Sequence, residues 1–294
     1  MSAPQYWELT VSVPADASEG LVNFVWELGA LGVVEEEPGA GHGVPRLRAF
    51  FSGSVSADTL RARLHDYVAG LSALGFGVID DARITAVTDP GWALAWRDHF
   101  RPLPVGRRLL VVPPWATAPR GRVVIVIEPG RAFGTGHHGS TIGCLELLEL
   151  IVEREGPPRA LDLGTGSGIL AIAAAHLGVD AVLALDDDPD AVANARRNVA
   201  LNSTGERVSC RLQEVSAVTA DPAPLVLANL LAPAHRRLAS TYRRLVTAGG
   251  SLVLGGILPA EAHQVGEALR RCGFQPKASR TREGWTALAL ARGD

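Results

Sequence analysis

The chain has 294 residues, of which 47% are hydrophobic and 20% are charged, and its formal net charge at pH 7 is −3. This length is enough for two domains with sizeable cores, and the charge balance disfavours a DNA-coating protein, which needs a basic face. Three cysteines without CxxC spacing, a start unlike a signal peptide, and no apolar run near the roughly 18 residues of a membrane span predict a cytoplasmic protein with reduced thiols and no membrane contact.

The first third of the chain predicts a small α+β domain, because alternating apolar residues give way to apolar residues at helical spacing and then alternate again. The predicted elements are strand 6–13, helix 21–28, strands 33–34 and 47–51, helix 60–71 and strand 78–87. This β-α-β-β-α-β order is that of a ferredoxin-like sandwich, so we expect residues 1–88 to form a ferredoxin-like α+β domain.

The pattern changes after Asp89-Pro90-Gly91, where residues 89–103 predict a linker helix. Residues 104–294 then alternate between strands and helices, which is typical of an α/β domain with a doubly wound, mostly parallel sheet. The predicted elements are strands 109–112, 123–127, 160–163, 181–185, 208–212, 225–228 and 252–254, helices 141–153, 169–177 and 189–201, two helices flanking strand 252–254, and an antiparallel hairpin within 276–291.

The strongest functional signal is a glycine-rich segment between a predicted strand and a helix, Asp162-Leu163-Gly164-Thr165-Gly166-Ser167-Gly168. Glycines at every second position let the backbone turn sharply and approach a ligand with no Cβ in the way. The spacing differs from the G-x-G-x-x-G of dinucleotide-binding folds, and an acid precedes it. That acid favours a cofactor with a cationic amino-acid tail over one with a pyrophosphate. We expect cofactor contacts at Asp162, Gly164 and Gly166.

Asp186 stands at the carboxyl end of the next predicted strand, about 20 residues after Gly164. A carboxylate in this place grips a ribose diol with its two acceptor oxygens, so we expect Asp186 to bind the cofactor ribose. Asp188, followed by Pro189, predicts the N-cap of the next helix. Two alternatives stay open, namely a surface turn followed by a capping acid and an NAD-type site.

Asn229 follows a later predicted strand, in Ala228-Asn229-Leu230-Leu231-Ala232-Pro233. In a doubly wound sheet this position faces the cleft at the switch point. An Asn side chain there can accept an N–H from a substrate amine while the carbonyl of Leu230 accepts another, so we expect these two groups to carry the catalytic positioning. The alternative is that Asn229 caps the following helix.

Residues 128–141 form a second glycine-rich segment, which is typical of a lid or a cofactor cradle. We expect further cofactor contacts in it, at Phe133, Gly134 and His138. His137 and His138 are adjacent and diverge in direction, with no carboxylate or thiol spaced to help, so we expect no metal site. Ser140 or Thr141 is the expected N-cap of the next helix.

These motifs resemble those of the ribosomal protein L-11 methyltransferase family. The resemblance rests on Trp92, Trp96 and His99-Phe100, on Pro129-Gly130-Arg131-Ala132-Phe133-Gly134-Thr135-Gly136-His137, on the glycine motif, on Asp186-Asp187-Asp188-Pro189, on the Asn229 motif and on Gly256-Ile257-Leu258. It implies a Rossmann-like class I methyltransferase domain, S-adenosylmethionine as cofactor, and an N-terminal domain that recognises the protein substrate. By position, the family's cofactor contacts fall on Thr141, Gly164, Asp186 and Asn229.

The resemblance further implies methylation of the N-terminal α-amine and lysine ε-amines of the large-subunit ribosomal protein L-11, by a monomer without direct nucleic-acid contact. The chain departs from the family's usual residues at Ser140, where Thr is usual, at Glu128, where Asp is usual, at Gly255, where Ser is usual, and at Asp187, where an apolar residue is usual. Alternative hypotheses are a related protein-lysine or small-molecule methyltransferase and a non-catalytic S-adenosylmethionine-binding scaffold. Asn229 weighs against the scaffold, because binding alone needs no amine-facing acceptor.

Overall fold

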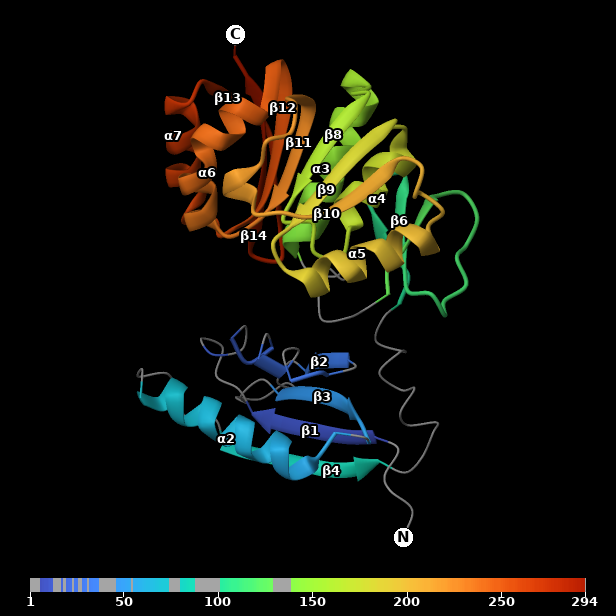
Figure 1. The fold of residues 1–294 in the computed structure, drawn as a ribbon, viewed down its shortest axis with the longest axis vertical. Coiled ribbons are helices and arrows are strands. Elements are labelled where there is room, and N and C mark those ends of the chain that lie inside the picture. The colour runs from blue at the N-terminus through green and yellow to red at the C-terminus, as the bar shows by residue number, and fades with distance from the viewer. Residues whose placement is uncertain are drawn as a thin grey trace. The chain divides into compact units, whose positions relative to one another are not determined.

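The computed structural model describes residues 6–12, 17, 20–22, 24–25, 28–30, 32–36, 46–53, 55–73, 80–87, 101–128 and 139–293. The chain divides into two compact units, Met1–Arg101 and Pro102–Asp294 (Figure 1). The predicted helix of the linker, at residues 92–100, lies outside the described residues. The assignment of roles to residues 1–88, 89–103 and 104–294 stays a prediction.

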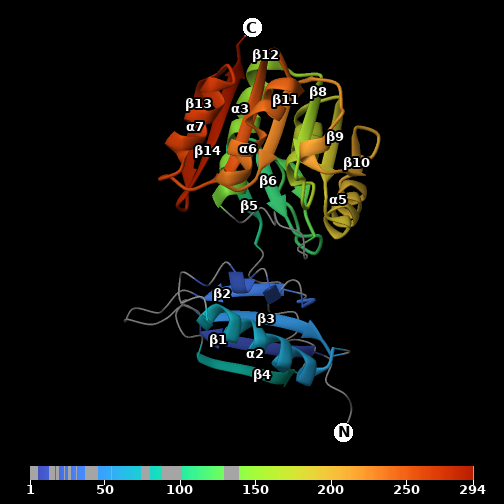
Figure 2. The same cartoon turned by 60° about the vertical axis from the view of Figure 1, so that its left-hand side comes forward.

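The first unit contains an antiparallel sheet in the order β2-β3-β1-β4. Its strands are β1 (Tyr6–Ser12), β2 (Gly32–Glu36), β3 (Arg46–Ser52) and β4 (Asp80–Val87). Helix α2 (Ala57–Ala73) lies against this sheet (Figure 2). Its Leu60 and Leu64 are buried in one cluster with strand residues such as Leu9 and Phe51. This strand order, with the first and third strands in the middle, is that of the predicted ferredoxin-like sandwich.

The second unit is built on a seven-stranded sheet in the order β10-β9-β8-β11-β12-β14-β13. The strands are β8 (Arg159–Leu163), β9 (Ala181–Asp186), β10 (Val208–Leu212), β11 (Ala223–Asn229), β12 (Val246–Ile257), β13 (Phe274–Arg282) and β14 (Trp285–Arg292). The first five of the order are parallel, and β13 and β14 form the antiparallel end hairpin. The predicted Rossmann-like, mostly parallel sheet is confirmed.

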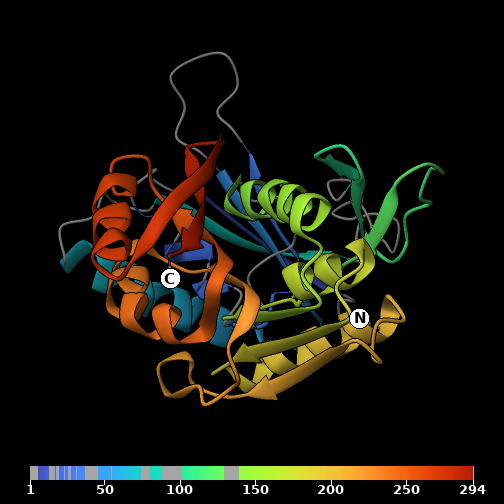
Figure 3. The same cartoon turned by 90° about the horizontal axis from the view of Figure 1, so that it is seen from above.

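Helices cover both faces of this sheet. Successive side chains of a strand point to opposite faces, and here both sets are apolar and have to be buried. Along β11, Leu225 and Leu227 join one core cluster, whereas Val226 and Ala228 join the other. The first cluster contains side chains of α3 (Gly139–Glu155), α4 (Ile169–Leu177) and α5 (Pro189–Leu201), and the second those of α6 (Ala232–Leu245) and α7 (Ala262–Arg271). Figure 3 shows α3 on one side of the β12–β14 region and α6 and α7 on the other.

The predicted runs at 109–112 and 123–127 are strands, but they form a sheet of their own. β5 (Leu103–Val105), β6 (Leu109–Val112) and β7 (Val123–Val126) pair in that order, β5 antiparallel and β7 parallel to β6. Their buried side chains pack into the same core cluster as α3 and α4. An apolar run in the sequence indicates that a strand is buried, but it does not indicate which strand pairs with it. The sequence-based prediction therefore groups these strands with those of the large sheet.

Within the described part of the chain, none of the helices combines the length and the apolar character that a bilayer crossing demands.

The N-cap prediction at Asp188 is confirmed, because its carboxylate accepts the N–H of Asp190 at 2.8 Å and Pro189 is the first residue of α5. A negative side chain also suits the positive end of the helix dipole there.

Candidate functional site

Three strands end side by side at one edge of the large sheet. In the pairing register Leu163 of β8 is aligned with Leu185 of β9 and with Ala228 of β11. The next residues along each strand, Gly164, Asp186 and Asn229, therefore lie in one row at the carboxyl edge. The chain proceeds from β8 to β9 and β10 on one side, whereas β11 lies on the other side of β8. This is the topological switch point, where open α/β sheets bind their ligands.

The loop after β8 needs glycine at its first position. Gly164 has φ +71°, a backbone conformation that residues with a side chain rarely adopt, and a Cβ there would also lie 2.5 Å from Cδ2 of Leu230, whose side chain would have to shift. The backbone N–H groups of Gly164 and Thr165 both donate to the carbonyl of Leu185 at 2.8 Å. The loop is thus fixed against the end of β9 and lies close to the turn after β11.

Asp186 faces the glycine loop with a largely buried carboxylate, 8% exposed. One oxygen accepts the N–H of Gly166 at 2.8 Å and the other accepts that of Asp188 at 3.1 Å. Burial raises the pKa of this carboxyl, while the two backbone donors oppose that rise. A carboxylate has about four acceptor positions, so each oxygen retains capacity for a further donor, such as one hydroxyl of a diol.

Asp162 lies beneath the loop. It is 1% exposed, and its Oδ2 accepts the hydroxyl of Thr165 at 2.6 Å and the N–H of Ala171 at 3.2 Å. It therefore ties the loop to the start of α4. Burial raises its pKa to about 7, against the effect of these two donors. Its Oδ1 is buried and has no hydrogen-bond partner in the described structure, and its contact with a cofactor stays a prediction.

Asn229 is held by the first turn of α3. Its Nδ2 donates to Ser140 Oγ at 3.3 Å and to Thr141 Oγ1 at 3.2 Å. The alternative that Asn229 caps the following helix is wrong, because the N-cap of α6 is Leu231. The N-cap prediction for Ser140 or Thr141 is also wrong, because α3 begins at Gly139 and both residues lie within its first turn. Their hydroxyls are turned towards the Asn229 amide instead.

The other amide atom of Asn229, Oδ1, is buried without a hydrogen-bond partner in the described structure. It lies against a bulge in β12, where a Cβ on Gly255 would be 2.6 Å from it. A buried acceptor left unpaired costs about 1–3 kcal/mol, and native proteins rarely leave one so without a reason. An orphan acceptor at the switch point, beside the glycine loop, is therefore the feature that most directly calls for a ligand with an N–H or O–H donor.

Sequence reasoning missed two groups at this site. One is the Ser140 hydroxyl as a partner of Asn229, and the other is His235, a fully buried residue of α6. His235 Nε2 lies 2.8 Å from the carbonyl oxygen of Gly255, and Nδ1 lies 2.9 Å from the hydroxyl of Tyr242. A histidine six residues after Asn229 gives no sequence signal of its own, because its partner in β12 is 20 residues away.

Burial lowers the pKa of His235 to about 4, against the opposing effect of the Gly255 and Leu230 carbonyl groups near its ring. Above pH 6.5 this histidine is neutral in both the folded and unfolded chain. As the pH falls below 6.5 only the unfolded chain gains the proton, so we expect the free energy of unfolding to fall by up to about 3 kcal/mol by pH 4. Denaturant titrations across this range should give a smaller fall for His235→Phe; equal pH slopes would contradict the prediction.

The predicted cofactor contacts Phe133, Gly134 and His138 lie outside the described residues, as does His137. Among the residues that are described, no group of three or more His, Cys, Asp or Glu side chains is placed to hold a metal ion.

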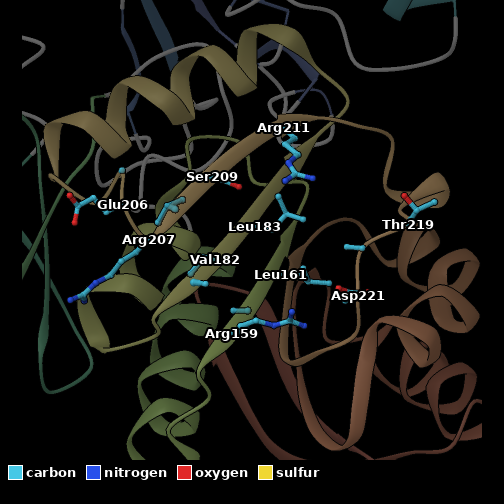
Figure 4. A pocket seen from close by; sticks show the side chains of 15 residues that line it. Arg159, Leu161, Val182, Leu183, Glu206, Arg207, Ser209, Arg211, Thr219 and Asp221 are labelled. Atoms are coloured by element: carbon cyan, nitrogen blue, oxygen red, sulfur yellow. The ribbon is translucent and has the colours of Figure 1, made fainter.

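A hollow of about 520 Å³ lies elsewhere, over the amino halves of β8, β9 and β10 (Figure 4). Its floor includes Leu161 and Leu183, and Arg159, Arg207 and Arg211 line it. It is remote from the carboxyl edge along the strands, so we do not assign the cofactor to it.

Comparison with known proteins gives a family model that matches nearly the whole chain. Residues 5–293 match the family model described as Ribosomal protein L11 methyltransferase (PrmA). A protein of Trichlorobacter lovleyi with the same description is 36% identical and is covered over 99% of both chains. Another, from Symbiobacterium thermophilum, is 40% identical over 78% of this chain and 74% of its own. A solved structure of ribosomal protein L11 methylase from Lactobacillus delbrueckii subsp. bulgaricus has TM-score 0.61 and 29% identity, covering 66% of this chain and 100% of that one.

Proposed function

Because the chain belongs to the ribosomal protein L11 methyltransferase family, we propose that it transfers methyl groups from S-adenosylmethionine to amines of ribosomal protein L11. The acceptors in this proposal are the N-terminal α-amine and lysine ε-amines. The observation that supports it most directly is the unpartnered, buried Oδ1 of Asn229 at the switch point. An amine supplies the N–H donor that this oxygen lacks.

The residues at the carboxyl edge fit S-adenosylmethionine. Asp186 retains acceptor capacity for the ribose hydroxyls, and glycine at position 164 lets the side chain of Leu230 lie close to the loop beside it. The unpartnered Oδ1 of Asp162 is an acceptor for the ammonium of a methionine tail, and that positive charge would favour the carboxylate form of Asp162. When bound, this cofactor supplies a methyl group on a positively charged sulfur, which is the electrophile of the reaction.

The protein's part in the reaction is to orient a neutral amine. In this proposal Asn229 Oδ1 and the Leu230 carbonyl each accept an N–H, which leaves the nitrogen lone pair free. The bound cofactor would supply the methyl group, the electrons of its C–S bond would stay with sulfur, and the methylated ammonium would lose a proton to solvent. The pKa of an α-amine is about 7.7–8.0 and that of lysine about 10.4, and exclusion of water favours the neutral form of both. Positioning therefore suffices, without a strong general base.

The proposal is tested with the purified chain, isotopically labelled S-adenosylmethionine and purified L11. Mass spectrometry of the L11 peptides should place label on the N-terminal amine and on lysines. Label on another ribosomal protein, or on a small molecule in preference to L11, would replace the substrate in this proposal by that acceptor. Tight cofactor binding with no transfer to any acceptor would favour the scaffold hypothesis.

We also propose that residues 1–88 recognise the protein substrate and that a monomer in the cytoplasm carries out the reaction without direct nucleic-acid contact. All described candidate site residues belong to the unit Pro102–Asp294, whose sheet has its own two core clusters. A chain that begins at Asp89 should therefore bind S-adenosylmethionine within about threefold of the full chain. Its kcat/KM on L11 should fall about tenfold or more, because the docking energy that presents each amine is lost.

Calorimetry and steady-state kinetics measure the two quantities for the truncated and full chains. A short L11 N-terminal peptide serves as the control substrate. It has little surface to dock, so truncation of the enzyme should lower kcat/KM less for the peptide than for intact L11. Equal kcat/KM on intact L11 would assign the first domain another role, and loss of cofactor binding in a folded truncated chain would move the domain boundary.

A further inference from the structure

Strand β12 contains a bulge next to the candidate site. Leu254 pairs with Leu288 of β14 and Ile257 pairs with Thr286, so Gly255 and Gly256 together oppose the single residue Ala287. Gly256 has φ +71°. A bulge of this kind interrupts the ladder of hydrogen bonds and leaves backbone groups to be satisfied by other partners.

His235 supplies that partner for the Gly255 carbonyl. A carbonyl oxygen only accepts, so the Nε2 that lies 2.8 Å from it carries the proton. Nδ1 is then an acceptor and receives the hydroxyl of Tyr242 at 2.9 Å. Both side chains are fully buried, and they lie two helical turns apart on α6. The chain from Tyr242 through His235 to Gly255 thus fixes the histidine tautomer and anchors the bulge to the helix.

The bulge also contacts the two groups that are proposed to bind the amine, Asn229 Oδ1 and the Leu230 carbonyl. A Cβ on Gly256 would lie 2.3 Å from the carbonyl oxygen of Leu230 and 3.3 Å from Asn229 Oδ1, and one on Gly255 would lie 2.6 Å from the same Oδ1. The bulge backbone therefore touches both proposed acceptors. A shift of the bulge moves them, and displacements of about 1 Å at a reacting centre can cost about a hundredfold in rate.

We propose that His235 is a positioning residue for methyl transfer: by holding the Gly255–Gly256 bulge it sets the direction of Asn229 Oδ1 and of the Leu230 carbonyl. This inference rests on the proposed function, since it assigns the two oxygens to the acceptor amine. It concerns the amine side of the site alone, because neither residue of the Tyr242–His235 pair contacts the glycine loop or Asp186 through a described hydrogen bond. The rate of transfer should therefore depend on His235 far more than cofactor affinity does.

The test compares four variants with the parent: His235→Phe, which keeps a ring but loses both bonds, His235→Gln, which can still donate to Gly255, Tyr242→Phe, and His176→Phe. His176 is a matched control, a partly buried histidine of α4 whose ring lies 3.4 Å from Asn202. Calorimetric titration with S-adenosylmethionine gives the affinity and the fraction of binding-competent protein. Single-turnover methylation of L11 at saturating cofactor gives the rate per competent site.

We expect His235→Phe to lower that rate about tenfold to a hundredfold, with cofactor affinity within about threefold of the parent. His235→Gln should recover part of the rate, Tyr242→Phe should lose less than His235→Phe, and His176→Phe should match the parent. Should His235→Phe fail to fold, His235→Gln and Tyr242→Phe decide, and a parent-like rate in both overturns the proposal. A folded His235→Phe with a lower Tm but a parent-like rate per competent site also overturns it, because that histidine would then only stabilise the fold. A parent that binds cofactor but does not methylate L11 would overturn the proposed function instead.

Discussion

Asn229→Ala is expected to reduce single-turnover methylation of L11 about a hundred- to a thousandfold, the usual effect of removing one preorganised polar contact from an active site. The substitution removes Oδ1, the buried acceptor without a partner, and also the Nδ2 bonds to Ser140 and Thr141. Because those two hydroxyls can turn to other acceptors, the free energy of unfolding should change much less than the rate. Rapid-quench measurements at saturating cofactor give the rate, and denaturant titration gives the stability.

Asn194→Ala is the matched control for this experiment. Asn194 is another buried asparagine of the same unit, on α5, and its Oδ1 has one weak hydrogen bond, from Asn198 at 3.5 Å. Asn194→Ala should change the free energy of unfolding, while the single-turnover methylation rate per folded molecule should stay that of the parent. An Asn229→Ala rate within about threefold of the parent would remove Asn229 from the mechanism.

Asp186→Ala should weaken binding of S-adenosylmethionine about a hundredfold or more. Two hydrogen bonds to a charged acceptor contribute about 1.5–3 kcal/mol each, and a tenfold change in affinity corresponds to about 1.4 kcal/mol. The variant also loses the bond that holds Gly166 at 2.8 Å, so the loop itself should loosen. Calorimetric titration measures the affinity for S-adenosylmethionine and, in parallel, for NAD.

The neighbouring Asp187 is exposed, and Asp187→Ala therefore removes the same charge without removing the proposed ribose contact. We expect its affinity to stay within about threefold of the parent. A comparable loss of affinity in both variants would show that Asp186 acts through its negative charge and not through hydrogen bonds to the ribose. Tighter binding of NAD than of S-adenosylmethionine by the parent chain would contradict the assignment of the cofactor.

The parts of the site that could be predicted are those whose signals are local in the sequence. The glycine loop, Asp186 and Asn229 each follow a strand directly, and parallel strands bring such residues to one edge whatever the side chains between them. The structure brings Gly164, Asp186 and Asn229 together as that argument requires. The Asp188 cap and the end hairpin are equally local, since each depends on a few adjacent residues.

Contacts between distant segments could not be predicted. Ser140 and Thr141 occupy the positions typical of a helix cap, yet their hydroxyls bind a side chain 88 or 89 residues away. The sequence around Asp162 predicts a ligand contact but gives no sign that Asp162 also binds Thr165 and Ala171 and so joins the loop to α4. The bulge of β12 depends on the register between β12 and β14, which neither strand encodes alone.

The place of Leu230 has a thermodynamic consequence. One of its methyl groups lies where a side chain on Gly164 would begin, at 2.5 Å from that Cβ position, and its carbonyl is the proposed acceptor for the amine. Leu230 therefore belongs to the amine-binding turn and also lies against the cofactor loop, so the proposed sites for S-adenosylmethionine and for the amine have this residue in common. Linkage then requires reciprocity: by whatever factor bound cofactor changes the affinity for the protein substrate, bound protein substrate changes the affinity for the cofactor. Leu230 is the residue through which such a coupling would pass, because its side chain lies against the glycine loop and its carbonyl is the proposed amine acceptor.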